Sequence, residues 1–488
     1  MSIRNKLYLL SESDQKDKLL TMPFGLKKQS SSTTITPARL PTSSPHLTNK
    51  VNGVNKADPP NLKRRLSSST CSASSPSSIT PVKTTVTTTA PTKKPKPMKC
   101  ITHSELMVKA IKSKYRPFFT QTNDETDDSP RSSPLKDDYV LTLEYPGTGE
   151  YENFLLLKPI KLNARQDDIE EDNDEYHPVN DIYQTAFWIH DCYLTPAQQA
   201  RLGDGSHGIM RNLTKYRNRR NGPRFAHAVD EFNKVIREFK AAGEIARNAK
   251  QLGHPSYDLT CHILYQVYSR TVAHQADALN NYQAFSNYVY GEINASLVNE
   301  FITKTNMTSK SVFMDLGCGI GNVVLQVAAQ TGCESYGIEI METPCKMAKR
   351  QLKEYATRMK AWSLPTGKVH FRHGDFLDTA ANDMYTTMKR ADVLLVNNYA
   401  FDATTNHSLA QMFLDLKEGT KIISLKSFVP KHHKINQRTL DMPESILKVE
   451  EFEYYSEAVS WTNNSGMYYL ATVDRSRLKP FYDALYPK

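Results

Sequence analysis

A glycine-rich turn at residues 315–321 is the part of this sequence whose residue types best suit the binding of a ligand. It begins with Asp315 and contains Gly317, Gly319 and Gly321. Glycines have no Cβ, so the backbone can approach a ligand closely, and the helix predicted to start after the turn begins with its amide donors exposed. The spacing is not that of the dinucleotide fingerprint, and a carboxylate at Asp315 would repel a pyrophosphate. The Asp315 carboxylate favours a cationic ligand group, such as the methionine end of S-adenosylmethionine.

Two further acidic residues stand at the ends of the next predicted strands. Glu339 ends the second strand, where a carboxylate can accept hydrogen bonds from both ribose hydroxyls of a nucleoside. NAD enzymes also place an acid at this position, so Glu339 alone does not choose between cofactors. Asp375 and Phe376 follow the third strand, where the acid can accept from the adenine amino group and the ring can pack on the base. Three acids at successive strand ends lie on the carboxyl edge of the sheet, where open α/β sheets bind their ligands. With the turn, they predict a methyltransferase.

The fourth predicted strand ends at Val396 and is followed by Asn397, Asn398 and Tyr399. In class I methyltransferases this position lies against the transferred methyl group. Enzymes that methylate amino groups of nucleic-acid bases usually carry two prolines and an aromatic residue after the first Asn or Asp. The absence of proline from this loop argues against a base amino group as the methyl acceptor.

The elements that must position these residues begin near residue 311, where short apolar segments alternate with amphipathic helices. Strands are predicted at Val312–Leu316, Ser335–Ile338, Val369–Arg372, Val393–Val396, Ile422–Leu425, Leu447–Tyr454 and Met467–Val473. Helices are predicted at Asn322–Ala329, Pro344–Trp362 and Thr405–Leu416. The fold class is therefore an open, doubly wound α/β sheet of seven strands, the Rossmann-like architecture of class I methyltransferases. The last two strands have no helix between them and are expected to form an antiparallel hairpin at the sheet edge.

The chain ahead of this sheet divides into a tail and a lobe. Residues 1–100 hold 17 Lys and Arg against 4 Asp and Glu, so they carry all of the excess positive charge of a chain whose net charge is +10. Ser, Thr, Pro and Lys dominate, and such a composition cannot bury enough apolar surface to fold. We expect a disordered basic tail at 1–135, a lobe of strands and then helices at 136–290, and the methyltransferase domain at 291–488.

Basic clusters in the tail favour nucleic acid or nuclear import over a plain solubilising linker. They comprise Lys63, Arg64 and Arg65, and Lys93, Lys94 and Lys96. A second basic cluster, at residues 211–224, could contact nucleic acid or could form an exposed helix face. The acidic run at residues 167–175 is interpreted as a solvated loop.

Several classes of protein are excluded by composition. No run of 18 or more apolar residues exists, so no membrane span is expected, and the N-terminus has no apolar core typical of a secretory signal. The 7 cysteines are scattered without a CxxC pair, which favours a reducing compartment and predicts neither disulfides nor a metal site.

Several segments, in this order, resemble the disruptor of telomeric silencing family, the histone lysine methyltransferases that lack a SET domain. They are LNNYQAFSNYVYGE (279–292), VFMDLGCGIGNVVLQVAA (312–329), YGIE (336–339), GDFL (374–377), VNNYAF (396–401), SWT (460–462) and YYLATVDR (468–475). The match covers about 172–486. The resemblance implies methylation of a lysine on the folded core of histone H3 within the nucleosome, with S-adenosylmethionine as methyl donor. It also implies a role in chromatin regulation and telomeric silencing, a nuclear location and, in our interpretation, a monomer.

Residue roles are carried over by motif. The resemblance assigns cofactor contacts to Tyr290, Gly291, Glu292, Ile293, Phe313, Met314, Asp315, Leu316, Gly317, Cys318, Gly319, Ile320, Gly321, Asn322, Glu339, Asp375, Phe376 and Leu395. It assigns an aromatic channel for the substrate lysine to Phe285, Trp461 and Tyr468, with Asn397 at its inner end. A narrow apolar channel lowers the pKa of a lysine by desolvation, so no residue is assigned as a general base. Ile293, Cys318 and Asn322 depart from the family's usual residues. Backbone contacts can preserve the roles of Ile293 and Cys318, and Asn322 keeps the side-chain amide of the usual Gln.

Two other functions are compatible with parts of the pattern. An RNA or DNA methyltransferase could hold its substrate with the basic tail, although the loop after Asn397 and the SWT segment oppose it. A non-enzymatic chromatin-binding module would be expected to have a degraded cofactor site, but Asp315, Glu339 and Asp375 are all present.

Overall fold

The computed structural model describes residues 100–119, 135–136, 138–160, 176–280, 291–379 and 383–485. All of them belong to one compact unit. The basic clusters of the predicted tail and the acidic run 167–175 lie outside the described residues. No helix within these ranges is long and apolar enough to cross a membrane, and no three His, Cys, Asp or Glu side chains within them are grouped to hold a metal ion.

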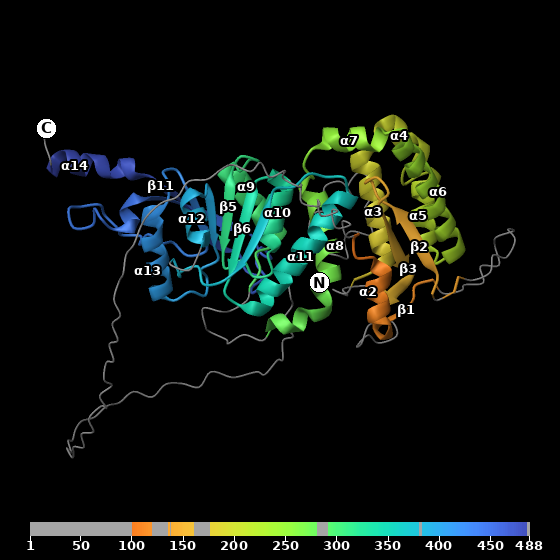
Figure 1. Ribbon diagram of the computed structural model, residues 1–488, viewed down its shortest axis with the longest axis horizontal. Coiled ribbons are helices and arrows are strands. Elements are labelled where there is room, and N and C mark those ends of the chain that lie inside the picture. Colours follow the sequence, from red (N-terminus) through yellow and green to blue (C-terminus); the bar gives the residue numbers. More distant parts are fainter. Residues whose placement is uncertain are drawn as a thin grey trace, which may run out of the picture. The chain divides into compact units, whose positions relative to one another are not determined.

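A seven-stranded sheet forms the C-terminal part of the described chain, with strand order β10-β11-β9-β8-β5-β6-β7 (Figure 1). Its strands are β5 (Val312–Leu316), β6 (Glu334–Glu339), β7 (Val369–His373), β8 (Val393–Val396), β9 (Lys421–Ser424), β10 (Leu447–Tyr454) and β11 (Gly466–Val473). The five strands from β9 to β7 in this order are parallel, whereas β11 pairs antiparallel with both β9 and β10. The predicted strands and the edge hairpin are confirmed, each boundary to within a residue.

Helices cover the two faces of this sheet. They are α9 (Ala295–Thr305), α10 (Asn322–Thr331), α11 (Glu342–Ala361), α12 (Asp383–Arg390) and α13 (Ala403–Met412), followed near the C-terminus by α14 (Lys479–Leu485). The predicted helices 322–329, 344–362 and 405–416 are present, although the last ends as a short 3-10 turn, η4 (Phe413–Asp415). Helix α12 was not predicted. Only two of its eight residues, Met384 and Met388, are buried, too few for a clear apolar period.

The alternation of side chains along the central strands explains why both faces are covered. Phe313 of β5 and Val393 of β8 point into a core shared with α9 and α10. Met314 and Leu394, the next residues of the same strands, point into the opposite core with α12 and α13. Because successive residues of a strand face opposite sides, a strand that is apolar throughout must be buried on both.

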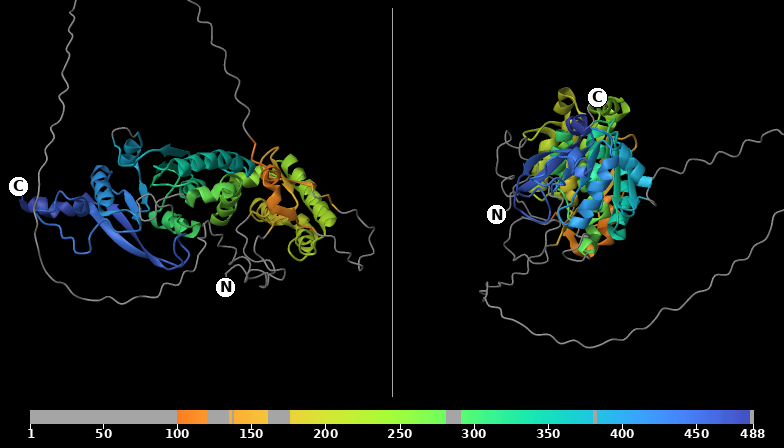
Figure 2. Two further views of the ribbon diagram at one scale, coloured as in Figure 1. Left: turned by 90° about the horizontal axis from the view of Figure 1, so that it is seen from below. Right: turned by 90° about the vertical axis from the view of Figure 1, so that its left-hand side faces the viewer.

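The N-terminal lobe combines two small antiparallel sheets with a set of helices (Figure 2). Its strands are β1 (Tyr115–Pro117), β2 (Val140–Glu144), β3 (Tyr151–Leu155) and β4 (Leu157–Pro159), with β1 paired to β4 and β2 to β3. Its helices are α2 (Ser104–Ala110), α3 (Pro178–Tyr193), α4 (Pro196–Leu202), α5 (Gly208–Asn218), α6 (Gly222–Ala241), α7 (Glu244–Leu252), α8 (Tyr257–Thr271) and the 3-10 segment η3 (Ala273–Asn280). The predicted order of strands followed by helices is therefore present, with one helix, α2, before the strands.

The expected upper bound of the disordered tail, residue 135, is wrong. Helix α2 and strand β1 both precede it, and Ile101, Val108 and Tyr115 are buried. Met107, Val108 and Tyr115 form a small core with residues of β3 and β4. The segment folds because its few apolar side chains meet Leu155 and Leu157, which lie 40 or more residues further along the chain, and local composition does not reveal such contacts.

The lobe and the sheet domain share one hydrophobic core across the predicted boundary at residue 290. The cluster that contains α3, α6 and α8 of the lobe continues into Leu325 of α10 and into Tyr355, Met359 and Trp362 of α11 and its C-cap. Helices α8 and α11 pack side by side (Figures 1 and 2). The position of α11 in the sheet domain therefore depends on the lobe.

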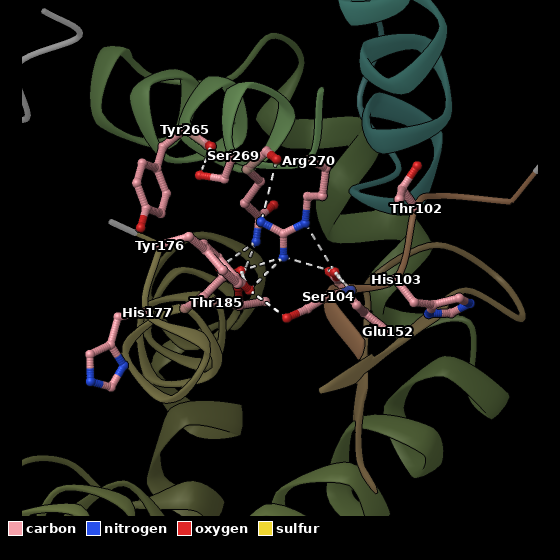
Figure 3. Close-up of polar contacts among 12 residues, drawn as sticks. Thr102, His103, Ser104, Glu152, Tyr176, His177, Thr185, Tyr265, Ser269 and Arg270 are labelled. Atoms are coloured by element: carbon pink, nitrogen blue, oxygen red, sulfur yellow. Dashed lines mark hydrogen bonds and ion pairs between the residues drawn. The ribbon is translucent and has the colours of Figure 1, made fainter. Parts of the chain in front are cut away.

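A fully buried set of charged side chains lies at this junction (Figure 3). Glu152 of β3 accepts a hydrogen bond from Arg270 of α8 at 2.8 Å and from Arg358 of α11 at 2.6 Å. Arg270 also pairs with Asp181 of α3 at 2.5 Å. The Tyr145 hydroxyl donates to Glu152 Oε2 at 2.8 Å. Arg270 holds the pKa of the Asp181 carboxyl well below its usual range against the effect of burial. These contacts connect elements far apart in the sequence, from β3 to α11.

Candidate active site

A pocket opens at the carboxyl ends of β5, β6 and β8, where the chain progression across the sheet reverses. From β5 the chain runs outward through β6 to β7, whereas β8 and β9 lie on the other side of β5. Open α/β sheets bind ligands at such a point. The pocket is lined by Gly291, Glu292, Ile293, Asp315, Gly317, Cys318, Gly319, Ile320, Asn322, Val323, Glu339, Ile340, Met341, Pro344, Asp375, Phe376, Leu377, Leu395, Asn397, Phe401 and Thr405.

The glycine turn between β5 and α10 forms the floor of the pocket. Gly317, Gly319 and Gly321 have φ angles of +89°, +54° and +86°, which side chains disfavour. A Cβ on Gly321 would lie 2.3 Å from the Phe371 ring, so this glycine allows the turn to pack on β7. A Cβ on Gly317 would meet no protein atom within 4 Å, because that side of Gly317 faces open space. Gly317 therefore leaves room for a ligand, and Gly321 lets the turn fit the sheet.

Asp315, the fourth residue of β5, lines the pocket. It is 3% exposed, and no hydrogen bond or ion pair reaches its carboxyl group within the described part of the chain. Burial raises the pKa of this carboxyl to about 8, with a further contribution from Glu339. A buried carboxylate without a counter-charge is costly, and a cationic ligand group would remove that cost. Asp315 thus fits the cationic methionine end of S-adenosylmethionine.

Glu339, at the end of β6, braces the glycine turn and lines the pocket. Its two oxygens accept from the backbone amides of Gly319 at 2.8 Å and Met341 at 2.7 Å. Burial raises the pKa of Glu339, and these two backbone donors oppose that shift. A carboxylate oxygen can accept more than one hydrogen bond, so both oxygens retain capacity for ribose hydroxyls.

The third acid, Asp375, and its neighbour Phe376 also line the pocket. Asp375 accepts from the backbone amide of Leu377 at 2.8 Å, which closes the turn after β7. The Phe376 ring lies 5.9 Å from the Phe401 ring, with an interplanar angle of 34°. These two aromatic rings give the pocket an apolar region suited to a purine. The acids predicted at three strand ends are therefore brought together in one pocket.

Residues 291–293 line the pocket from another segment of the chain. The backbone of Glu292 donates to Ser460 Oγ at 2.8 Å, and its carbonyl accepts from the Ser460 amide at 2.9 Å. The Asn322 side chain donates to Glu292 Oε2 at 3.3 Å and accepts from Gln351 at 3.0 Å. The SWT segment therefore positions the cofactor-side residues Glu292 and Ile293, and Asn322 orients the Glu292 carboxylate.

Asn397 and Trp461 lie at the edge of the site. The Asn397 amide donates to the Gly291 carbonyl at 3.3 Å, and Asn397 lines the pocket. Trp461 does not line it. Its ring packs against Gly291, where a Cβ would lie 2.7 Å from the ring, and lies 5.3 Å from the Tyr399 ring.

Tyr468, which the resemblance assigns to the substrate channel, is a buried residue of β11. Its side chain is 1% exposed, packs against Phe301 and Phe452, and donates to Glu300 Oε1 at 2.6 Å. Burial and the Glu300 hydrogen bond raise the pKa of Tyr468. It is not among the residues that line the pocket. Phe285 and Tyr290 lie outside the described residues, so the aromatic channel stays a prediction.

Some predicted cofactor residues support the pocket without lining it, and others were missed. Phe313, Met314 and Leu316 of β5 are buried in the cores, and Gly321 packs on Phe371. The pocket also contains residues that were not predicted, namely Val323, Ile340, Met341, Pro344, Leu377, Phe401 and Thr405. Ile340, Met341 and Leu377 come one or two residues after a predicted acid, so their position after a strand end was the available signal in the sequence.

The parallel sheet with an antiparallel edge hairpin, the glycine turn and the acids at three strand ends define the fold of class I S-adenosylmethionine-dependent methyltransferases. Residues 268–473 match the model of the family described as histone methylation protein DOT1. This part of the chain therefore carries the domain of that family.

Curated relatives carry the name histone-lysine N-methyltransferase, H3 lysine-79 specific. The protein of Emericella nidulans is 37% identical over 343 residues, which are 70% of this chain and 66% of that protein. The protein of Yarrowia lipolytica is 45% identical over 254 residues, 52% of this chain and 51% of that protein. The chain thus spans just under two thirds and about half of their lengths. Among solved structures, an O-methyltransferase from Bacillus cereus in complex with SAH aligns with 43% of this chain and 90% of its own at 13% identity and a TM-score of 0.28.

Proposed function

We propose that this protein is a histone-lysine N-methyltransferase that methylates a lysine on the globular core of histone H3 in the nucleosome. The observation that carries the proposal is a pocket with Asp315, Glu339 and Asp375 at successive strand ends, in a chain that carries the domain of the DOT1 family. The names of its relatives make lysine-79 of histone H3 the proposed acceptor.

The residues of the site suggest how such a transfer would be supported. S-adenosylmethionine supplies an electrophilic methyl group next to a positive charge. Asp315 provides the compensating negative charge, and Glu339 and Asp375 orient the nucleoside. Asn397, which lines the pocket and donates to the Gly291 carbonyl, is the residue beside which we expect the acceptor amine to enter. Positioning two reactants in line can supply several kcal/mol of a reaction barrier, about 7 to 11 in favourable cases. A neutral lysine is required, and desolvation at an apolar entrance favours that form without a general base.

Mass spectrometry of recombinant nucleosomes is the experiment that tests this function. After incubation with the protein and S-adenosylmethionine, we expect one to three methyl groups on a core lysine of histone H3. Free DNA and free RNA, incubated in parallel, should remain unmodified. Methylation of the nucleic acids with unmodified histones would replace the proposal by a nucleic-acid methyltransferase.

Binding of S-adenosylmethionine should release a proton from Asp315. The carboxyl, whose pKa is about 8, is mostly protonated at pH 7 and must ionise to pair with the cation. Affinity should therefore rise by up to about tenfold per pH unit below pH 8 and level off above it. Calorimetry in two buffers of different ionisation enthalpy measures the release directly. The difference between wild type and Asp315→Asn should approach one proton at pH 7, and equal proton counts in the two proteins would refute the assignment.

The basic tail is proposed to hold nucleosomal DNA, in a nuclear enzyme that acts as a monomer in chromatin regulation and telomeric silencing. Lys63, Arg64, Arg65, Lys93, Lys94 and Lys96 are its proposed phosphate contacts. The proposed domain organisation keeps the lobe and the sheet domain, and ends the tail before Ile101, which is buried.

Deletion of residues 1–98 should weaken nucleosome methylation by at least about tenfold near 0.15 M salt, because cations that contact phosphates supply much of non-specific DNA affinity. Binding of S-adenosylmethionine, followed by calorimetry, should be unchanged, since no pocket residue is removed. Equal nucleosome methylation by the two proteins would show that the tail is not required.

A further inference from the structure

The second basic cluster of the sequence lies on helix α5 and the turn that follows it. Residues 205–229 contain six Lys and Arg and no Asp or Glu. Arg211, Lys215 and Arg219 are spaced four residues apart, so they share one side of the helical segment. Met210 and Leu213 are buried on the other side. The cluster is therefore a fixed face of the folded lobe and not part of a tail.

This face carries its charge without compensation. Arg211, Lys215 and Arg219 form no ion pair with any residue that the structure describes. Like charges four residues apart on a helix destabilise it, and here two such pairs follow one another. In contrast, Arg201 on α4 and Arg237 on α6 each pair with a glutamate.

A neighbouring pair of strands also brings like charges together. Arg116 of β1 stands directly opposite Lys158 of β4 in the antiparallel ladder, an arrangement that is unfavourable for like charges. Lys112 and Lys114, just before β1, are exposed. Two separate elements of the lobe thus place like charges side by side.

Aromatic contacts join the strand pair to the helix. The Arg220 guanidinium lies 3.8 Å from the centre of the Phe118 ring, which follows β1, and Phe118 contacts the His177 ring edge-on at 5.1 Å. Arg217 lies 4.3 Å from the centre of the Tyr183 ring on α3. His177 points away from the buried network of Arg270 (Figure 3). Burial lowers the pKa of His177 to about 3, and the nearby charges of Arg220 and Arg217 add to this effect. Lys158 of β4 makes a smaller contribution. Cations of the helical segment and of the strand pair therefore lie close to His177.

We propose that this surface, formed by Arg211, Lys215, Arg217 and Arg219 with Arg116 and Lys158, binds the phosphate backbone of duplex DNA. The cations extend over a helix and a strand pair, and Arg211 and Arg219 alone are about 12 Å apart along a helical axis. Such a spread suits a row of phosphates better than a single phosphate group. Because the inference rests on the proposed action on nucleosomes, the DNA would be nucleosomal. It would be a second contact, independent of the tail.

The test measures binding of the full chain to a fluorescent 30-base-pair duplex at several salt concentrations, without S-adenosylmethionine. The variant combines Arg211→Gln, Lys215→Gln and Arg219→Gln. The matched control combines Lys310→Gln, Lys368→Gln and Lys448→Gln, which remove three exposed cations from the sheet domain. Each lost phosphate contact should reduce the slope of log K against log salt by about 0.9. The variant should therefore bind at least about tenfold more weakly near 0.1 M salt, whereas the control should match wild type.

Several results would decide against the surface. Equal slopes for variant and control would mean that these side chains are merely solvated. Unchanged DNA binding with weakened nucleosome binding would assign the face to an acidic histone surface instead. The melting temperature of the variant should not fall, since repulsion between like charges is removed; a large fall would show a structural role. Failure of histone methylation leaves the DNA measurement intact, so the two proposals can fail separately.

Discussion

Gly317→Arg should abolish S-adenosylmethionine binding while leaving the fold intact, with affinity reduced by at least 100-fold in calorimetry. Gly317 has a φ of +89°, and its Cβ position faces open space inside the pocket. The new side chain would occupy the room that the ligand needs. A positive φ costs a side chain about 1–2 kcal/mol, which is too little to unfold a domain of ordinary stability.

Gly149→Arg is the matched control for this substitution. Gly149 has a φ of +71° and also has no atom within 4 Å of its Cβ position, but it lies in the exposed turn between β2 and β3. Both variants therefore carry a similar backbone cost, and only one of them places a side chain in the pocket. Retained cofactor binding by Gly317→Arg, or equal losses in the two variants, would exclude the turn as the cofactor site.

Glu152→Ala should destabilise the whole described unit. The substitution leaves Arg270 and Arg358, both fully buried, without their shared carboxylate. Removing one partner of a buried ion pair costs about 3–5 kcal/mol. This is a large part of the 5–15 kcal/mol that a folded protein typically has, and it should lower the melting temperature by roughly 10 °C.

The effect should extend to the cofactor site, because Arg358 lies on α11, and Met341 and Pro344 at the start of that helix line the pocket.

Glu238→Ala removes the partner of Arg201 on the surface, and it should leave the melting temperature within about 2 °C of wild type. Glu152→Gln, which keeps hydrogen-bonding capacity and removes the charge, should fall between the two. A melting temperature of Glu152→Ala within 2 °C of wild type would show that the buried charges are dispensable.

The sequence by itself determined the sheet and the cofactor side of the site, because both depend on local patterns. Apolar runs of strand length alternate with helical periods, so strand ends can be located to within a residue. Once the order of strands is known, their carboxyl ends share one edge, and Asp315, Glu339 and Asp375 must meet there. The glycines of the turn require no long-range information either, since a positive φ is a property of the local backbone.

Only the tertiary structure decided the features that depend on contacts between distant segments. In β11, Tyr468 and Tyr469 face opposite sides of the sheet, and only the packed structure shows that Tyr468 joins Phe301 and Glu300 in the core. Trp461 meets Gly291 because two loops far apart in sequence are hydrogen-bonded to each other.

The same reason applies to the junction of the lobe and the sheet domain. Glu152, Arg270 and Arg358 are separated by more than 80 residues, and each alone resembles an ordinary surface charge. Their fully buried pairing holds α11 against the lobe. Ser104 also donates its backbone amide to Glu152, so the folded chain begins earlier than its composition suggests. Sequence periodicity reports which face of an element is buried, but it does not report which distant charge will meet it there.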